Sequence, residues 1–231
     1  MIAVSAKDIA ASENQQIRHF QQSLSPYLLE RFSSANYQLA PQNTKAFVDR
    51  HFSQAKHYGF ETTRDIRSFI ELSFVLGVNF EKDPQLAWAS QILLNPQYSP
   101  WEKITKLQKR AQFHLERVLE CGVKFPIKPY QQLRTKYFDI LQQSNLQAGQ
   151  VLSLFACFWP KKAETLNSAT HSILLNKQSP LSSILSQNEI ITLAFLLGFE
   201  FDTNPRYPWA QYQSISGTQI WAHLDHLFGK G

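Results

Sequence analysis

Few side chains in this sequence have the types and spacing that catalysis or metal binding requires. The closest candidates for metal ligands are His223, Asp225 and His226, which stand close together near the C-terminus. Neither a fourth ligand nor the outer-shell groups that orient ligands can be named from the sequence. A solvated helix face is therefore the favoured interpretation, and we expect no metal site.

The remaining titratable candidates also favour structural roles. His51 and His57 flank the expected end of a helix before Gly59, where a cationic side chain interacts favourably with the helix dipole. Asp83 would suit a general base, but Asn204 stands at the equivalent place of an internal repeat, and both residue types cap helix N-termini. The sequence has no GxSxG, P-loop, GxGxxG or HExxH motif. We expect a protein that is not an enzyme and that needs no cofactor.

The two cysteines, Cys121 and Cys157, lie in apolar segments without the spacing of a metal site or a redox motif. We expect both to be buried free thiols, with a disulfide or a reactive thiol as the alternative.

A basic and aromatic surface is the one feature that suggests binding. The segment 100–120 is predicted to form an amphipathic helix whose apolar side carries Trp101, Ile104, Leu107, Ala111, Leu115 and Val118. The other side gathers Lys103, Lys106, Arg110 and Arg117, with Phe113 beside them. An aromatic side chain among cations suits a protein partner with an acidic surface. The alternative is a solvated face whose Phe113 is covered by a neighbouring helix. No nucleic-acid reading motif accompanies the row, so we expect no nucleic-acid binding.

An internal repeat dominates the organisation of the chain. Residues 70–89 return as residues 191–210 without a gap. The identical pairs are almost all apolar, Gly or Pro: Ile70/Ile191, Leu72/Leu193, Phe74/Phe195, Leu76/Leu197, Gly77/Gly198, Phe80/Phe201, Pro84/Pro205, Trp88/Trp209 and Ala89/Ala210. Such residues specify a corner and a core, whereas catalysis would call for recurring polar groups.

Each copy predicts the same corner between two helices. A glycine in a left-handed conformation ends the first helix, a phenylalanine turns inward, an Asp or Asn followed by proline caps the second helix, and a tryptophan covers the corner. These residues are Gly77, Phe80, Asp83, Pro84 and Trp88 in the first copy, and Gly198, Phe201, Asn204, Pro205 and Trp209 in the second. A capping box follows each corner, Ser99 with Glu102 and Ser216 with Gln219.

The fold class predicted from these signals is all-α, a multi-helix bundle of two related helical modules. We expect an N-terminal module at 1–122 and a degenerate C-terminal module at 130–231, which could pack as one domain. Expected helices cover 13–24, 25–33, 44–58, 63–76, 84–94, 100–120, 130–143, 147–158, 161–176, 181–197, 205–213 and 217–228. The segment 151–159 could alternatively form a strand.

Composition sets the cellular context. The 231 residues are 43% hydrophobic and 18% charged, as in an ordinary globular protein, and the net charge of +5 leans toward an acidic partner. No stretch approaches the roughly 20 apolar residues that span a bilayer, and the N-terminus lacks the pattern of a signal peptide. We expect a cytoplasmic protein without membrane insertion.

The order of these signals resembles a known family. The matching positions are Phe47, Ala55, Tyr58, Gly59, Phe60, Arg64, Asp65, Ile66, Phe69, Ile70, Leu76, Gly77, Phe80, Asp83, Pro84, Trp88, Ala89, Ile92 and Leu93. This pattern is similar to the helical region of bacterial type VI secretion adaptor proteins, which are chaperones encoded beside spike and effector genes, and to small free-standing proteins from those gene neighbourhoods. The resemblance covers residues 17–119 and, more weakly, 184–228. The mixed α/β domain that precedes this region in the family has no match here.

The resemblance implies a non-enzymatic accessory protein of a type VI secretion system that binds an effector or the spike protein before secretion. The alternative is an immunity protein that binds and neutralises a cognate toxin. Both interpretations imply a protein partner, and neither fixes the oligomeric state.

Overall fold

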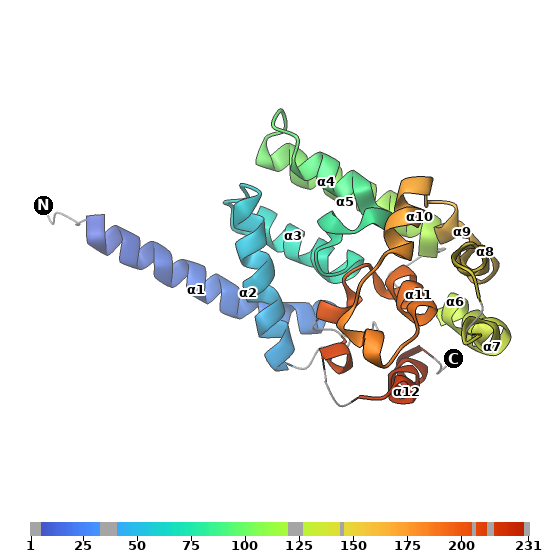
Figure 1. Cartoon of the computed structure of the whole chain (residues 1–231). Helices are drawn as coiled ribbons and strands as arrows, with labels where there is room; N and C mark the ends of the chain where they lie inside the picture. The colour runs from blue at the N-terminus through green and yellow to red at the C-terminus, as the bar shows by residue number, and fades with distance from the viewer. Residues whose placement is uncertain are drawn as a thin grey trace, which may run out of the picture.

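The computed structural model describes residues 6–32, 41–119, 127–143, 146–204, 207–211 and 215–228. Every regular element within these residues is helical, so the described part of the chain is an all-α multi-helix bundle, as the sequence predicts (Figure 1). The segment 151–159, for which a strand was the alternative, is helical to Phe158.

The N-terminal half consists of α1 (Ala6–Arg31), α2 (Pro41–His57), α3 (Thr63–Leu76), α4 (Ala87–Leu93) and α5 (Pro100–Leu119), with short 3-10 turns η1 (Phe80–Lys82) and η2 (Pro84–Leu86). Helix α1 projects from the body of the molecule and packs against α2 through its C-terminal part (Figure 1). Helix α2 in turn packs on α3, and α3 and α4 both pack on α5.

The C-terminal half is made of shorter pieces arranged around α11 (Gln187–Leu197), whose residues from Glu189 to Leu197 are all buried. The pieces are α6 (Ile127–Gln132), a π-helical turn η3 (Leu133–Tyr137), α7 (Phe138–Leu141), α8 (Ala148–Phe158), α9 (Pro160–Ala163), α10 (Ser168–Leu175), the 3-10 turns η4 (Pro180–Ser183), η5 (Phe201–Thr203) and η6 (Pro208–Gln211), and α12 (Gly217–Phe228).

Several predicted helix boundaries are wrong, for reasons of packing or of helix capping. Helix α1 runs through Pro26 instead of breaking before it, because Leu24 and Leu28 on either side are buried and hold the helix against the body. The helix predicted at 161–176 is split, since the Asn167 side chain caps a new helix by accepting from Thr170 N at 2.8 Å. The helix predicted at 181–197 likewise restarts at the Ser186 capping box.

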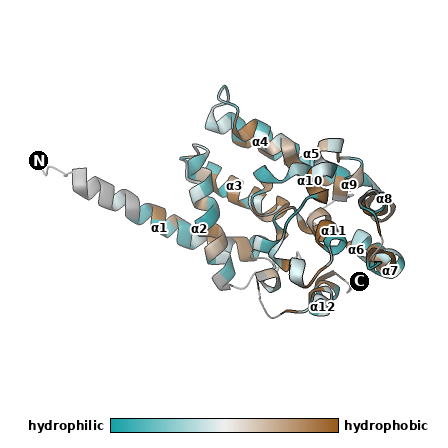
Figure 2. Ribbon diagram, viewed as in Figure 1, coloured by the Kyte–Doolittle hydropathy of each residue, from teal (hydrophilic) through white to brown (hydrophobic). Residues whose placement is uncertain are grey.

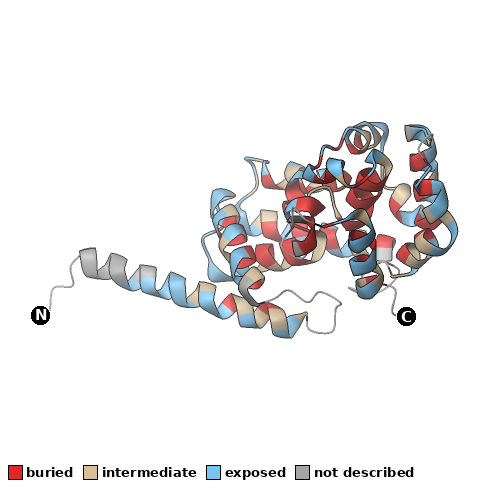
Figure 3. Cartoon of the chain, turned by 60° about the horizontal axis from the view of Figure 1, so that its bottom comes forward, coloured by how far each residue is buried: buried red, intermediate tan, exposed pale blue. Residues whose placement is uncertain are grey.

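Among the described residues, buried apolar side chains form two clusters. Figure 2 colours the ribbon by hydropathy and Figure 3 colours it by burial. One cluster lies within α1 to α5, and the other lies within the C-terminal half and includes Val118 from the last turn of α5. Helix α5 therefore contributes to both cores. The division predicted between 1–122 and 130–231 stays a prediction, because residues 120–126 lie outside the described part of the chain.

The two copies of the corner have the same backbone hydrogen bonds. Gly77 N donates to Ser73 O at 3.1 Å and Gly198 N donates to Ala194 O at 3.2 Å. The next bonds also repeat: Phe80 N to Gly77 O and Phe201 N to Gly198 O, Asp83 N to Phe80 O and Asn204 N to Phe201 O, Leu86 N to Asp83 O and Tyr207 N to Asn204 O. Pro205 lies outside the described residues.

Both corner glycines adopt a conformation that essentially only glycine populates. Gly77 has φ 118° and ψ 159°, and Gly198 has φ 102° and ψ 152°. The positive φ agrees with the prediction, but ψ is extended, so these residues do not adopt the left-handed helical conformation expected of them. The chain thus leaves each helix sharply, and Phe80 and Phe201 turn inward and are buried.

The corners pack against each other. Asn79 Nδ2 donates to Glu200 Oε2 at 2.7 Å, and these two residues hold equivalent positions in the repeat. Asp83 Oδ2 accepts from Phe199 N at 2.9 Å, and Gln85 Nε2 donates to the carbonyl of Ala194 at 3.0 Å. The repeated segments therefore form part of the junction between the two halves of the chain.

Candidate protein-binding surface

Helix α5 begins at a capping box formed by Ser99 and Glu102. Ser99 N and Ser99 Oγ donate to Glu102 Oε2 at 2.8 and 2.7 Å, and Glu102 N donates back to Ser99 Oγ at 3.3 Å. These hydrogen bonds lower the pKa of the Glu102 carboxyl, because they stabilise its charged form. The predicted capping box is thereby confirmed, as is the one between Ser216 and Gln219.

The buried side of α5 agrees with the predicted apolar side, apart from its first turn. Ile104, Leu107, Ala111 and Val118 are buried, whereas Trp101 is 59% exposed. At 100° per residue, Trp101 points about 80° away from the middle of the buried side. Its indole therefore lies outside the contact with α3 and α4, although the sequence pattern places Trp101 on the apolar side of the helix.

The opposite side of α5 carries the four predicted cations and Phe113. We name these five residues the α5 basic row: Lys103, Lys106, Arg110, Phe113 and Arg117. Lys103 is half-buried, and the other four side chains are exposed. Phe113 is 53% exposed, so the alternative in which a neighbouring helix covers it is wrong. Arg110 lies over the Phe113 ring with its guanidinium carbon 5.4 Å from the ring centre.

The positive charges of the α5 basic row are only weakly compensated within the described residues. Lys106 Nζ lies 4.6 Å from the centre of the Tyr98 ring. Arg117 comes within 3.9 Å of Glu164 Oε2, and both side chains are largely exposed to solvent. Solvent screening makes such a pair worth little. The row is therefore a solvent-exposed cationic surface with an aromatic side chain in it.

His114 lies beneath this row and does not add to its charge. Burial lowers its pKa to about 4, and the nearby cations Lys162, Arg110 and Arg117 act in the same direction. Its ring lies 6.2 Å from the ring of Trp88. At neutral pH this imidazole is uncharged.

The other histidine candidates have structural environments. His51 lies buried within α2 rather than at its end, and its ring packs on Phe47 at 4.0 Å, so the prediction of a helix-terminal role for it is wrong. Its Nδ1 lies 2.7 Å from the Phe47 carbonyl one helical turn away, which ties the imidazole to the core. His57 is the last residue of α2, as expected.

The C-terminal trio does not converge on a common point. Asp225 is held by Arg134 through two bonds of 2.8 and 2.7 Å and by the Tyr130 hydroxyl at 2.7 Å. His223 and His226 are exposed. Among the described residues, no group of three or more His, Cys, Asp or Glu side chains is placed to hold a metal ion.

Asp83 has a larger role than the sequence indicates. It caps η2 as predicted, accepting from Gln85 N at 2.9 Å, and it also accepts from Phe199 N in the other copy of the corner. Burial raises its pKa, opposed by these hydrogen bonds and by the nearby Lys162. Lys162, which sequence analysis missed, donates to the Phe195 carbonyl, and burial lowers its pKa to about 8. Asp83 thus serves the junction between the halves, and Lys162 ties α9 to α11 within the C-terminal half.

The two tryptophans of the corners differ in burial. Trp209 is 4% exposed, but Trp88 is only half-buried. Cys157 is exposed, so the expectation of a buried thiol is wrong for this residue, and Cys121 lies outside the described residues.

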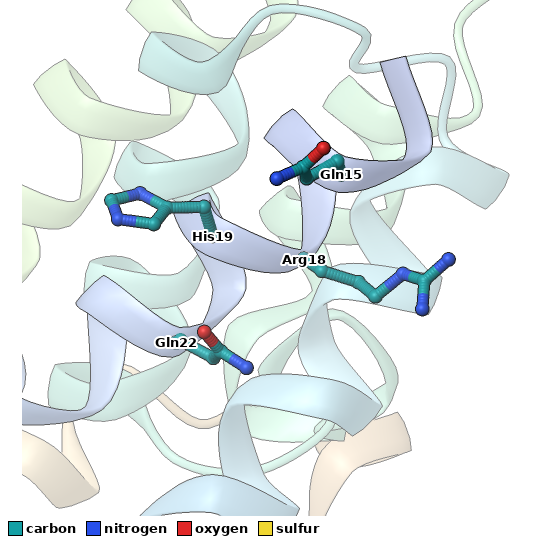
Figure 4. Close-up of a pocket in the computed structure, with 4 residues that line it drawn as sticks. All are labelled: Gln15, Arg18, His19 and Gln22. Atoms are coloured by element: carbon teal, nitrogen blue, oxygen red, sulfur yellow. The ribbon is translucent and has the colours of Figure 1, made fainter. Parts of the chain in front are cut away.

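A hollow on α1 is lined by Gln15, Arg18, His19 and Gln22, all from one helix. Figure 4 shows the Arg18 and His19 side chains pointing to opposite sides of that helix. Because these polar groups do not converge, they do not form a site with a defined ligand geometry.

No helix among the described residues is both long and apolar enough to cross a bilayer. Comparisons with protein families, with characterised proteins and with solved structures find no match to this chain.

Proposed function

We propose that this protein is a non-enzymatic, cytoplasmic adaptor that binds a protein partner through the α5 basic row. The observation that carries the proposal is Phe113, exposed on helix α5 between Arg110 and Arg117. Exposed aromatic side chains beside arginine supply apolar contact area and directional charge, and these residue types dominate binding energy at protein interfaces.

The nature of the partner follows from charge and from the sequence resemblance. A row of four cations attracts an acidic surface and raises its rate of association. The resemblance to type VI secretion adaptors supports a partner that is an effector or the spike protein. We accordingly propose an accessory role in loading or stabilising that partner before secretion.

Partner capture from the native host tests the binding role. Tagged wild-type protein should retain a partner that the Lys106→Glu, Arg110→Glu double variant loses. Both residues are exposed, so the variant should keep the circular dichroism of the parent. A partner retained equally by both proteins would refute binding through α5.

Deletion of the gene in the host separates the adaptor from the immunity alternative. For an adaptor, the deletion strain should stop secreting the partner and should survive contact with sister cells. Killing of the deletion strain by sister cells would contradict the adaptor role and would indicate an immunity protein.

A further inference from the structure

The α5 basic row has a regular spacing that defines the shape of what binds it. Its members follow one another at intervals of three, four, three and four residues, from Lys103 to Arg117. This is the spacing of a coiled-coil seam, in which side chains stay in line along one side of a helix. With a rise of about 1.5 Å per residue, the row is about 21 Å long.

We propose that the α5 basic row binds an acidic amphipathic α-helix of the partner, packed along α5. Its acidic side chains would repeat at the same three- and four-residue spacing, with one apolar side chain opposite Phe113. This inference rests on the proposed function, in which α5 is the docking surface, and it names the element of the partner that docks there.

Spacing favours a helix over an extended strand. Neighbouring members of the row stand about 4.5 or 6 Å apart along the axis, and an aligned partner helix presents its own side chains at the same intervals. A strand presents same-face side chains about every 6.7 Å. Four intervals of a strand would therefore span about 27 Å against a row of about 21 Å, and the strand would lose register by a whole position.

Charge favours an acidic helix over an apolar one. Within the described residues, only Arg117 of the four cations has a carboxylate within ion-pair distance, and that pair is exposed. The acidic residues of α5 are engaged elsewhere, because Glu102 caps the helix and Glu116 accepts from Gln112 Nε2 at 2.8 Å. An apolar helix would cover the cations without replacing their hydration, which is unfavourable.

Three synthetic peptides of 18 residues and equal net charge test this proposal against the full-length protein. The first is a helix with glutamates in seam positions and one leucine opposite Phe113. The second has the same residues distributed around the helix, and the third carries a central proline that breaks the helix. Fluorescence anisotropy should show the first peptide binding about tenfold more tightly than either control, and more weakly at high salt.

Variants of the protein locate the contact. Phe113→Ala should weaken binding of the first peptide about tenfold, whereas Trp101→Ala should leave the affinity for that peptide unchanged. Trp101 is the matched control, since it is an aromatic residue of similar exposure on the same helix but outside the row. Equal weakening by both variants, or equal binding of all three peptides, would overturn the proposal.

The outcome remains distinct from that of the proposed function. Suppose that binding of the captured native partner requires Lys106 and Arg110 but that the first peptide does not bind. Docking on α5 then stands, and the proposal that the partner docks through a helix is refuted. If the native partner binds the double variant as tightly as it binds the wild-type protein, the proposed function itself fails.

Discussion

Asp83 is one of the residues at which the two copies of the corner meet. One carboxylate oxygen accepts from Gln85 N within its own corner, and the other accepts from Phe199 N of the other corner. The second copy has Asn204 at this place, which suggests that either residue type would serve as a cap. The hydrogen bond from Phe199 N gives Asp83 a role beyond capping, so a substitution at position 83 is not a change of cap alone.

Asp83→Asn should therefore lower the free energy of unfolding. An amide has one acceptor oxygen, so its NH₂ group would face a backbone N–H that has lost its partner, at a cost of about 1 to 3 kcal/mol. Urea unfolding followed by circular dichroism measures this change. Asp49→Asn is the control, because its ion pair with Lys45 on α2 is exposed and worth little. Equal stability of the two variants would contradict the role of Asp83 at the junction.

The paired tryptophans should respond unequally to truncation. Trp209→Ala should cost about 3 to 5 kcal/mol, because it removes a buried indole from the C-terminal core. Trp88→Ala should cost less than half as much, since Trp88 is already partly exposed. Thermal unfolding of both variants gives the comparison, and a larger loss at Trp88 would mean that the burial described here is wrong.

At the scale of the element, the sequence indicates which segments are helical, but the ends of each helix depend on caps and on packing. Asn167 and Ser186 begin new helices through side-chain hydrogen bonds, and each stands inside a segment whose apolar pattern continues across it. Periodicity alone cannot find such a break, because it reports which residues share a face and not where the backbone turns.

The corner glycines give a test of backbone conformation in these elements. Gly77→Ala should destabilise the protein by about 1 to 3 kcal/mol, because alanine is strained at φ 118° and ψ 159° although the site has room for a Cβ. Gly149→Ala should instead raise stability by up to about 1 kcal/mol, since Gly149 lies in a helix and faces open space. Denaturant midpoints of the pair should shift in opposite directions, and a shared direction would argue against the strained corner.

Helix α5 should contribute a pH dependence through His114. The pKa of His114 is about 4 in the folded protein, against 6.5 for the unperturbed group. As pH falls, the unfolded chain therefore binds a proton at a higher pH than the folded protein does. Folding stability should therefore fall as pH drops from about 6.5 to about 4, by about 2 to 3 kcal/mol from this residue. Denaturation of wild type and His114→Gln across this range isolates the effect as the difference between them. Parallel curves for the two proteins would contradict it.

At the scale of the whole molecule, the repeated segments help to join the two halves of the chain, and α5 presents the proposed binding surface. Equivalent residues such as Asn79 and Glu200 contact each other across the junction, while α5 contributes buried side chains to both cores. The cationic side of α5 is thus held on a scaffold that is anchored from both halves, which reduces the ordering cost of binding.

The all-α class, the corner and the basic row follow from the sequence, because glycine, proline and apolar spacing act locally. The exposure of Trp101, the contact of Asp83 with Phe199 and the contact of Lys162 with Phe195 do not. These features depend on where one helix stops covering another and on residues far apart in the chain. The two-module division and the secretion partner stay predictions.

The central claim is that the α5 basic row binds the native partner, and association kinetics test it most directly. The captured partner should be purified and its association rate measured at low and high salt. Lys106→Glu, Arg110→Glu should slow association about tenfold at low salt and remove most of its salt dependence. A matched double reversal of exposed residues on α2, Arg50→Glu with Lys56→Glu, makes the same change in net charge and should have a much smaller effect. Identical association rates for wild type and the α5 variant would contradict the account.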